Sequence, residues 1–444
     1  MKYSFLTWLI IFLAVLSSCR KNDTSINPPP RGGDPLKDST LAIARDIYLW
    51  SDQIPDNFNA QEFENPDGVM TAIREFSIEP GFVDPVDHYS FAIKQDEWDN
   101  ISNGIVQDFG LYAFFLNDND LRVRSVEPAS SAGMSGIRRG WKLVKVAGNA
   151  NVTAANTDFL IQNIYESPST DFTFEKPDGT LVDVTLIAST YQEHPLYLDT
   201  IYEEGARKAG YLVFNSFLGD TSRMNSEFER IFRRFVDEGI TDLIIDLRYN
   251  GGGYVNLQST LANYVVKTAA NNDVMMNQEF NDNYKILNET TRFRKKGALN
   301  INNVYFIVSD NTASASELLI NNLRPYMNVK LVGPEATYGK PVGFFPIEAG
   351  DWYVFPVSFR STNSRGEGSY FDGIDVDHIT GDGLDRDWGD RSENSLAAAL
   401  QHIRSGSFAT APRTPSLNST LEPVTQELNR RMNQKAFKGA VGVK

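Results

Sequence analysis

Three short segments of the chain contain residue types that could work together in nucleophilic catalysis. The segment DLRYNGGG (Asp246–Gly253) follows an apolar run and ends in three glycines, which allow a ligand backbone to come close. The segment NTASASELL places Ser314 among small residues, directly before a predicted helix. The segment TYGK places Lys340 before the largely apolar PVGFFPI. This set could supply a nucleophile, a base and backbone N–H groups for a developing negative charge.

Ser314 has a second interpretation, because serine and threonine commonly cap the first turn of a helix. A nucleophilic serine also needs a base, and the four histidines lie among polar residues that are typical of a surface: His88, His194, His378 and His402. A Ser-His-Asp triad therefore has no local support. Lysine can replace histidine where burial keeps it neutral, and the mainly apolar surroundings of Lys340 favour this. An isolated lysine, however, is ordinarily a solvated surface group.

The elements that must position these segments follow an alternating pattern. Strand-like runs (AGYLVFNSF, TDLIIDL, NVYFIV, VKLVG) alternate with helical segments (SEFERIFRRFVDEG, STLANYVV, SASELLINNLR). The first of these helical segments places five apolar residues on one face: Phe228, Ile231, Phe232, Phe235 and Val236. The alternation predicts an α/β domain with largely parallel strands over residues 195–405. In such sheets, sites gather in the loops that follow the strands.

The first 35 residues predict export and anchoring. Residues 1–18 have the pattern of a signal peptide, with Lys2 before an apolar run and small residues before Cys19. LSSC (Leu16–Cys19) resembles the lipobox of bacterial lipoproteins, which implies cleavage before Cys19 and lipid attachment to its thiol. A membrane anchor with a chance cysteine is the alternative, but the apolar run is short for a spanning helix. Residues 19–35 predict an extended tether.

Two regions separate the tether from the α/β domain. Residues 36–98 show helical spacing in LAIARDIYLWSDQIP and DGVMTAIREF, and predict a small N-terminal helical domain. Residues 100–192 contain short β-runs and a hairpin with PDG as its turn. GLY, followed by VEPASSAGMSGIRRGWKLVKVAG, resembles a bacterial PDZ domain. That resemblance implies that Gly110, Leu111 and Tyr112 form a backbone site for the terminal carboxylate of a peptide.

Composition and charge exclude several classes of function. The net charge of −15 over 444 residues argues against a nucleic-acid partner. GPEATYGKPVG is not a phosphate-binding loop, because its glycine spacing is wrong and Pro341 stands where a magnesium-binding hydroxyl should be. The acidic segment 371–390 lacks the calcium-loop pattern and is interpreted as a solvated loop. No metal or cofactor is predicted. The tail, 406–444, fits a tether, a late helix (TQELNRRM) or disorder.

The order of the three segments is similar to that of the S41 peptidases, the carboxyl-terminal processing or tail-specific proteases. DLRYNGGG, NTASASELL and TYGK carry the resemblance, which extends over most of residues 40–400. It implies a multidomain α/β protein with a crotonase-like ββα protease core. It further implies Ser314 as nucleophile, Lys340 as general base and an oxyanion hole from the backbone N–H of Ala315 with that of Gly251 or Gly252.

Two positions depart from the family pattern. Phe344 stands where many members have a glutamine or glutamate that orients the dyad, so orientation must come from elsewhere, with Thr337 one candidate. Val376 replaces the proline of a family segment. These departures fit a divergent subgroup and also a protein of weak activity.

The sequence therefore predicts a Ser-Lys endopeptidase that needs no cofactor and cleaves unstructured or C-terminal segments of cell-envelope proteins. Its expected partners are polypeptides with disordered or apolar C-termini. The protein is expected in the bacterial cell envelope, anchored to a membrane by a lipid on Cys19 and facing the periplasm or the cell surface. The alternative is a catalytically weak or inactive relative that binds polypeptide C-termini or an apolar ligand.

Overall fold

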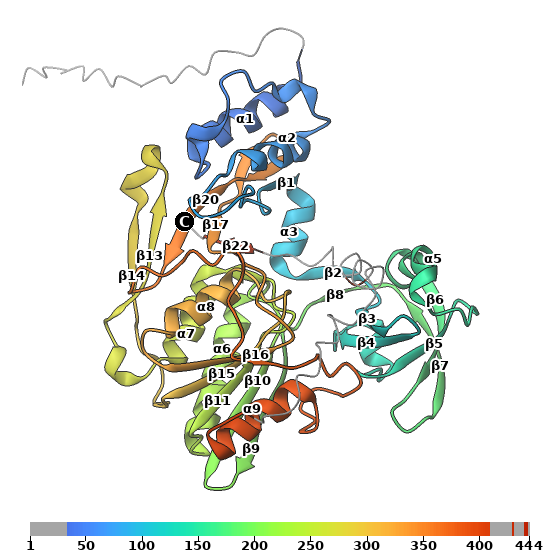
Figure 1. Cartoon of the computed structure of the whole chain (residues 1–444). Helices are drawn as coiled ribbons and strands as arrows, with labels where there is room; N and C mark the ends of the chain where they lie inside the picture. The colour runs from blue at the N-terminus through green and yellow to red at the C-terminus, as the bar shows by residue number, and fades with distance from the viewer. Residues whose placement is uncertain (1–32, 409–428, 430–438, 443–444) are drawn as a thin grey trace, which may run out of the picture.

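The computed structural model describes residues 33–408, 429 and 439–442 (Figure 1). The predicted signal peptide, Cys19, most of the tether and most of the C-terminal tail lie outside the described residues. Within the described part, no helix combines the length and the apolar character needed to cross a membrane.

The N-terminal region contains three helices: α1 (Pro35–Ile47), α2 (Pro66–Ile73) and α3 (Gln95–Asn103). The first two begin with proline after a capping side chain: Asp34 Oδ1 accepts from Leu36 N at 2.9 Å, and Asn65 Oδ1 accepts from Gly68 N at 2.9 Å. These helices do not enclose a core of their own. They share one apolar cluster with residues near position 350, such as Phe344 and Phe355.

A three-stranded antiparallel sheet joins this region to the later chain. It has the order β1-β19-β18, with bounds Phe91–Lys94, Trp352–Phe355 and Ile347–Ala349. The segment DHYSFAI, which ends in β1, is thereby held next to the part of the chain that follows Lys340.

A separate five-stranded antiparallel sheet forms the unit on the right of Figure 1. Its strands, in both chain and spatial order, are β3 (Leu111–Asn117), β4 (Asp120–Val126), β5 (Lys142–Val146), β6 (Ser169–Glu175) and β7 (Leu181–Ile187). Two short helices belong to the same unit, α4 (Ser131–Met134) and α5 (Thr157–Ile161). The hairpin predicted around PDG is confirmed, because β6 pairs with β7 on either side of it. A two-stranded ribbon, β2 (Ile105–Asp108) with β8 (Ser189–Gln192), connects the unit to the rest.

The predicted α/β region is a six-stranded sheet in the order β21-β16-β15-β11-β10-β9. The strand bounds are His378–Ile379, Asn328–Gly333, Asn303–Ile307, Asp242–Asp246, Arg207–Phe214 and Leu196–Glu204. All neighbouring pairs are parallel except β9 with β10. The prediction of substantially parallel strands is therefore confirmed.

Four helices pack on this sheet: α6 (Thr221–Asp237), α7 (Val255–Val265), α8 (Ala315–Leu323) and α9 (Asn394–Ser405). The first three contribute to one large core, and α9 packs in a different cluster with Tyr211, Ile244 and Tyr305. On α6 the predicted apolar face is confirmed: Phe228, Ile231, Phe232 and Phe235 are buried, and Val236 packs against the same core at partial burial.

A second six-stranded sheet has the order β12-β22-β17-β20-β13-β14. Its strands are Gly252–Tyr254, Gly439–Val441, Val342–Phe344, Val357–Thr362, Val274–Phe280 and Glu289–Arg292. The strand β22 comes from the end of the chain, where the sequence had left a tether, a helix or disorder open. It lies at the centre of Figure 1, beside β17 and above α7 and α8.

Candidate active site

The three predicted loops meet at the carboxyl ends of β11, β15 and β16. Two hydrogen bonds join the first two loops, from Ala313 N and from Ser316 Oγ to the carbonyl oxygen of Asn250, both at 3.0 Å. A third bond joins the serine loop to the lysine loop, from Tyr338 N to Thr312 O at 3.0 Å. The parallel sheet thus brings together segments that are far apart in the sequence.

Ser314 stands at the start of α8 in a conformation that is rare for a residue with a side chain. Its φ is 58° and its ψ is −108°, and only 1% of its surface is exposed. Ser314 and Glu317 have the arrangement of a capping box, yet the close bond is the one from Ser314 N to Glu317 Oε2, at 2.6 Å. The Oγ of Ser314 has no hydrogen-bond partner in the described chain. A strained, buried and unbonded hydroxyl is typical of a reactive site, and the capping interpretation does not account for it.

Lys340 is also buried, with 1% of its surface exposed. The Phe344 ring centre is 3.7 Å from its Nζ, and that of Tyr89 is 4.9 Å away. The Tyr89 hydroxyl also donates to the carbonyl of Gly339. Burial lowers the pKa of Lys340 well below its ordinary value, although Asp87 and Glu317 act in the opposite direction. A lysine in these surroundings is neutral over a wider pH range than a solvated one, as a general base requires.

Glu317 is the functional residue that the sequence analysis missed. Its Oε2 accepts from Ser314 N at 2.6 Å and from Lys340 N at 2.9 Å. Its Oε1 accepts from Thr337 Oγ1 and from Gly339 N, both at 2.6 Å. Burial raises the pKa of this carboxyl, and the four hydrogen bonds act against that rise. One carboxylate therefore fixes the backbones of the serine and the lysine relative to each other.

The sequence offered one signal for Glu317 that was not used. A glutamate three residues after a helix-capping serine can reach back to the serine N–H. Thr337, the residue suggested for orienting the dyad, bonds to Glu317 through its hydroxyl and accepts from Ile374 N at 2.8 Å. Its contribution therefore passes through the carboxylate. Phe344 is fully buried and lies against the lysine side chain.

The residues predicted to form the oxyanion hole lie close together. Ala315 is the first residue of α8, so its N–H is at the positive end of the helix. A Cβ added to Gly252, whose φ is +105°, would lie 3.0 Å from Ala315 N. The Gly252 N–H itself donates to Asn250 Oδ1 at 2.9 Å. Gly251 offers its carbonyl to the C-terminal strand, and accepts from Gly439 N at 2.9 Å.

The acidic segment is not simply a solvated loop, and for Asp382 that interpretation was wrong. Its carboxylate bonds to Arg139 of the five-stranded unit at 2.5 Å and to Arg248 of the glycine loop at 2.8 Å. Tyr249 donates to it as well. The segment is thus part of the support of the glycine loop, because Arg248 also pairs with Asp246 and Glu393. No group of side chains suited to a metal ion occurs among the described residues.

This network predicts a loss of stability in acid. Burial by itself would raise the pKa of Asp382, but Arg139 and Arg248 hold it at about 2, below the ordinary 3.8. The stabilisation is therefore present above pH 3.8 and is lost as the pH falls from there to 2, and it amounts to about 2 kcal/mol. We expect wild type to exceed Asp382→Asn in free energy of unfolding at pH 6, and that difference to shrink between pH 4 and pH 2. Urea unfolding at several pH values measures it, and a constant difference would contradict the assignment.

The predicted carboxylate-binding loop lies at the start of β3. The Gly110 N–H donates to Asp108 Oδ1 at 2.6 Å, and Leu111 is buried in the core of the five-stranded unit. Beside Tyr112, burial raises the pKa of Glu127 to about 8 and that of Glu193 to about 7. The role of this loop in peptide binding stays a prediction.

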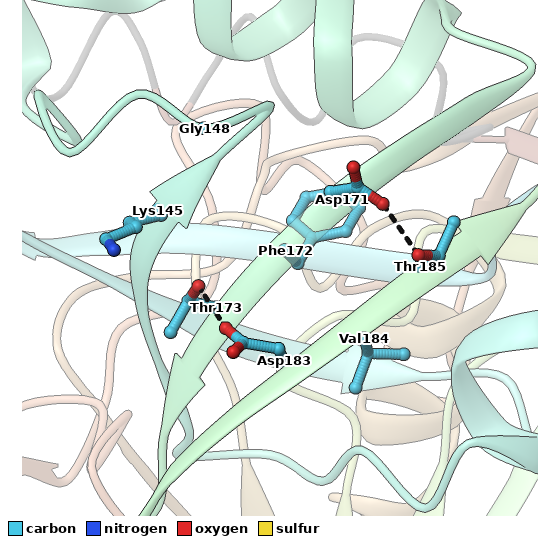
Figure 2. Close-up of a pocket in the computed structure, with 8 residues that line it drawn as sticks. All are labelled: Lys145, Gly148, Asp171, Phe172, Thr173, Asp183, Val184 and Thr185. Carbon is cyan, nitrogen blue, oxygen red and sulfur yellow. Dashed lines mark hydrogen bonds between the residues drawn. The ribbon is translucent and has the colours of Figure 1, made fainter.

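A surface pocket occurs on the same unit, away from Ser314 (Figure 2). It lies on β5, β6 and β7, and two of its carboxylates are already paired with threonines of the neighbouring strand. Asp171 accepts from Thr185 Oγ1 at 2.6 Å, and Asp183 accepts from Thr173 Oγ1 at 2.5 Å, as Figure 2 shows. The hydrogen bonds of these carboxylates are therefore already met in part by the protein itself.

The fold and the three loops agree with comparisons against known proteins. Residues 208–378 match the model of peptidase family S41. A probable CtpA-like serine protease of Staphylococcus aureus (strain N315) is 24% identical over 265 residues, 58% of this chain and 49% of that protein. The carboxy-terminal processing protease CtpA of Bacillus subtilis (strain 168) is 24% identical over 257 residues, 57% of this chain and 52% of that one. The chain thus matches about half the length of these curated relatives.

A solved structure covers more of the chain. A provisionally assigned S41 protease from Bacteroides fragilis NCTC 9343 superposes with a TM-score of 0.68 at 22% identity, over 83% of this chain and 97% of that one. The likeness establishes the fold of the multidomain α/β chain.

Proposed function

We propose that this protein is a serine endopeptidase with Ser314 as nucleophile and Lys340 as general base. One observation carries the proposal. Ser314, whose buried hydroxyl has no hydrogen-bond partner among the described residues, and the buried Lys340 both donate their backbone N–H to the same oxygen, Oε2 of Glu317. This shared acceptor fixes the position of a nucleophile relative to its base, and a site that only binds a ligand does not require that.

The chemistry follows from the charges and positions of these groups. Neutral Lys340 takes the proton of Ser314 Oγ as the oxygen attacks a peptide carbonyl. The Ala315 N–H, at the start of α8, faces the oxygen that becomes negative, and the helix adds a favourable dipole there. The Gly251 N–H is the candidate second donor, because the Gly252 N–H is bonded to Asn250 Oδ1. The lysine then protonates the leaving amine, and water releases the acyl group by the same route in reverse.

The proposed substrates are disordered or apolar C-terminal segments of cell-envelope proteins, with the enzyme tethered to a membrane through Cys19. Two features of the site favour an extended chain: the glycine loop and the small residues beside Ser314. A folded substrate could not present its backbone in this way.

Replacing the nucleophile tests the proposal. Residues 20–444 are incubated with a disordered polypeptide that ends in apolar residues, and mass spectrometry follows the products. We expect Ser314→Ala to lower the cleavage rate by about 10³-fold or more, because no other group supplies the attacking oxygen. Ser407→Ala, at an exposed serine, is the matched control and should cleave as wild type does. Binding of the polypeptide without cleavage by wild type would instead favour a protein that holds polypeptide ends.

A further inference from the structure

Residues 439–442 lie against two of the loops that form the candidate active site. Residues 439–441 form β22, which pairs in parallel with β12 and with β17. Gly439 N donates to Gly251 O at 2.9 Å, and Gly442 N donates to Phe344 O at 3.1 Å. One side of this short strand therefore bonds to the glycine loop, and the other bonds to the strand that follows Lys340.

The place that β22 occupies is one strand wide. In this sheet β12 has β22 as its partner and β17 lies on the far side, so the two flanking strands meet only through the C-terminal residues. A Cβ on Gly252 would be 2.5 Å from the carbonyl oxygen of Gly439 and 3.0 Å from Ala315 N. The Gly439 carbonyl thus lies beside the N–H that is expected to face a substrate carbonyl.

The side chain of Val441 anchors the strand. Only 3% of it is exposed, and it packs in the apolar cluster that contains Val342, Phe344 and Val357. Burial of a valine side chain is favourable, and it makes the backbone pairing specific for one register.

A second contact of the same tail occurs on the five-stranded unit. The side chain of Asn429 pairs with both backbone groups of Phe115 in the edge strand β3. Phe115 N donates to Asn429 Oδ1 at 2.8 Å, and Asn429 Nδ2 donates to Phe115 O at 3.2 Å. The tail therefore contacts two parts of the fold where an added peptide would find unpaired backbone.

We propose that the carboxyl-terminal segment Gly439–Gly442 is a resident ligand of the active site and competes with other polypeptide ends for the place beside Ser314. A ligand held on the same chain acts at an effective concentration in the millimolar range, so it excludes external ligands that bind weakly. The activity of the protein then depends on release of this segment. The kinetic part of this inference rests on the proposed peptidase function, whereas the binding part does not.

Binding is measured in full-length Ser314→Ala, with a fluorescently labelled peptide of the sequence AFKGAVGVK, which is residues 436–444. We expect Val441→Asp in this background to bind the peptide about tenfold more tightly than the parent, because a charged side chain cannot stay in the apolar cluster. Val83→Asp makes the same change at an exposed valine and should leave the affinity at the parent value. Equal affinity for all three proteins would overturn the inference.

Two further measurements keep the test decisive. If Val441→Asp unfolds at a lower temperature than its parent, a chain that ends at Lys438 replaces it and should show the same gain in affinity.

With Ser314 intact, Val441→Asp should lower KM for an external polypeptide by the same factor and leave kcat unchanged. Tighter peptide binding without any cleavage would retain this inference and reject the peptidase, and cleavage with an unchanged KM would do the reverse. If purified wild type loses residues 440–444 and Ser314→Ala does not, the segment is a substrate. The inference that it stays bound as a ligand would then be wrong.

Discussion

Replacing Lys340 with methionine is expected to lower kcat by about 10³-fold and to leave the fold at least as stable. Methionine has a similar length and no ionisable group, so it fills the same apolar space beside Phe344 and Tyr89. The rate falls because Ser314 loses the base that takes its proton, an effect typically of 10²–10⁴. Stability does not fall, because the variant no longer holds a group whose charged form is disfavoured by burial.

The pH dependence of stability and of activity gives a second check of this prediction. Since burial lowers the pKa of Lys340 below its value in the unfolded chain, the unfolded chain binds the additional proton between those two pKa values. The free energy of unfolding of wild type is therefore lowered as the pH falls through that interval, and Lys340→Met lacks this loss. Over the same interval kcat/KM of wild type should rise with pH through a value well below the ordinary 10.5.

Thermal unfolding and peptide hydrolysis between pH 5 and pH 10 measure both signs. Lys295→Met is the matched control, because it removes a half-buried lysine whose pKa is lowered by burial but which lies away from the three loops. It should retain full activity. A Lys340→Met variant that still cleaves peptide would rule out the Ser-Lys dyad.

Glu317→Gln is expected to lower both activity and stability. Each oxygen of Glu317 accepts two hydrogen bonds, so either orientation of a glutamine amide turns an NH₂ group toward donors. At least one backbone N–H, of Gly339 or of Ser314 and Lys340, then loses its acceptor. A buried unpaired donor costs about 1–3 kcal/mol. We expect a loss of about 2 kcal/mol in the free energy of unfolding and about 10²-fold in kcat, because the serine and the lysine shift relative to each other.

Chemical denaturation and steady-state kinetics separate the two effects of Glu317→Gln. KM should change little, because the carboxylate is fully buried and its four hydrogen bonds go to residues of this chain. Glu348→Gln, at an exposed position on β18, is the control and should behave as wild type. An enzyme with full kcat despite the lower stability would reduce Glu317 to a purely structural residue.

The sequence by itself predicted those features of this protein that depend on short stretches of residues. The alternation of apolar strands and amphipathic helices predicted the parallel sheet, because residues buried on both faces of a strand and on one face of a helix leave distinct periods. The three loops were recognisable because glycines, small residues and a lysine among apolar neighbours are each unusual at the end of a strand. These signals marked Ser314 and Lys340 as candidates, and the resemblance to the S41 peptidases implied their roles as nucleophile and base.

Only the tertiary structure decided how these residues are held and what lies between them. The role of Glu317 depends on donors more than twenty residues further along the chain, which approach it because two parallel strands end side by side. Asp382 looked solvated because nothing in its own segment indicates that Arg139 and Arg248 come to it. The strand β22 has three residues, too few for any period, and it exists because β12 and β17 leave their backbone groups unpaired on either side of it. Local sequence patterns indicate which residues are candidates for the site. Contacts between residues far apart in the sequence decide how these residues are oriented, which charges are paired and which part of the site β22 occupies.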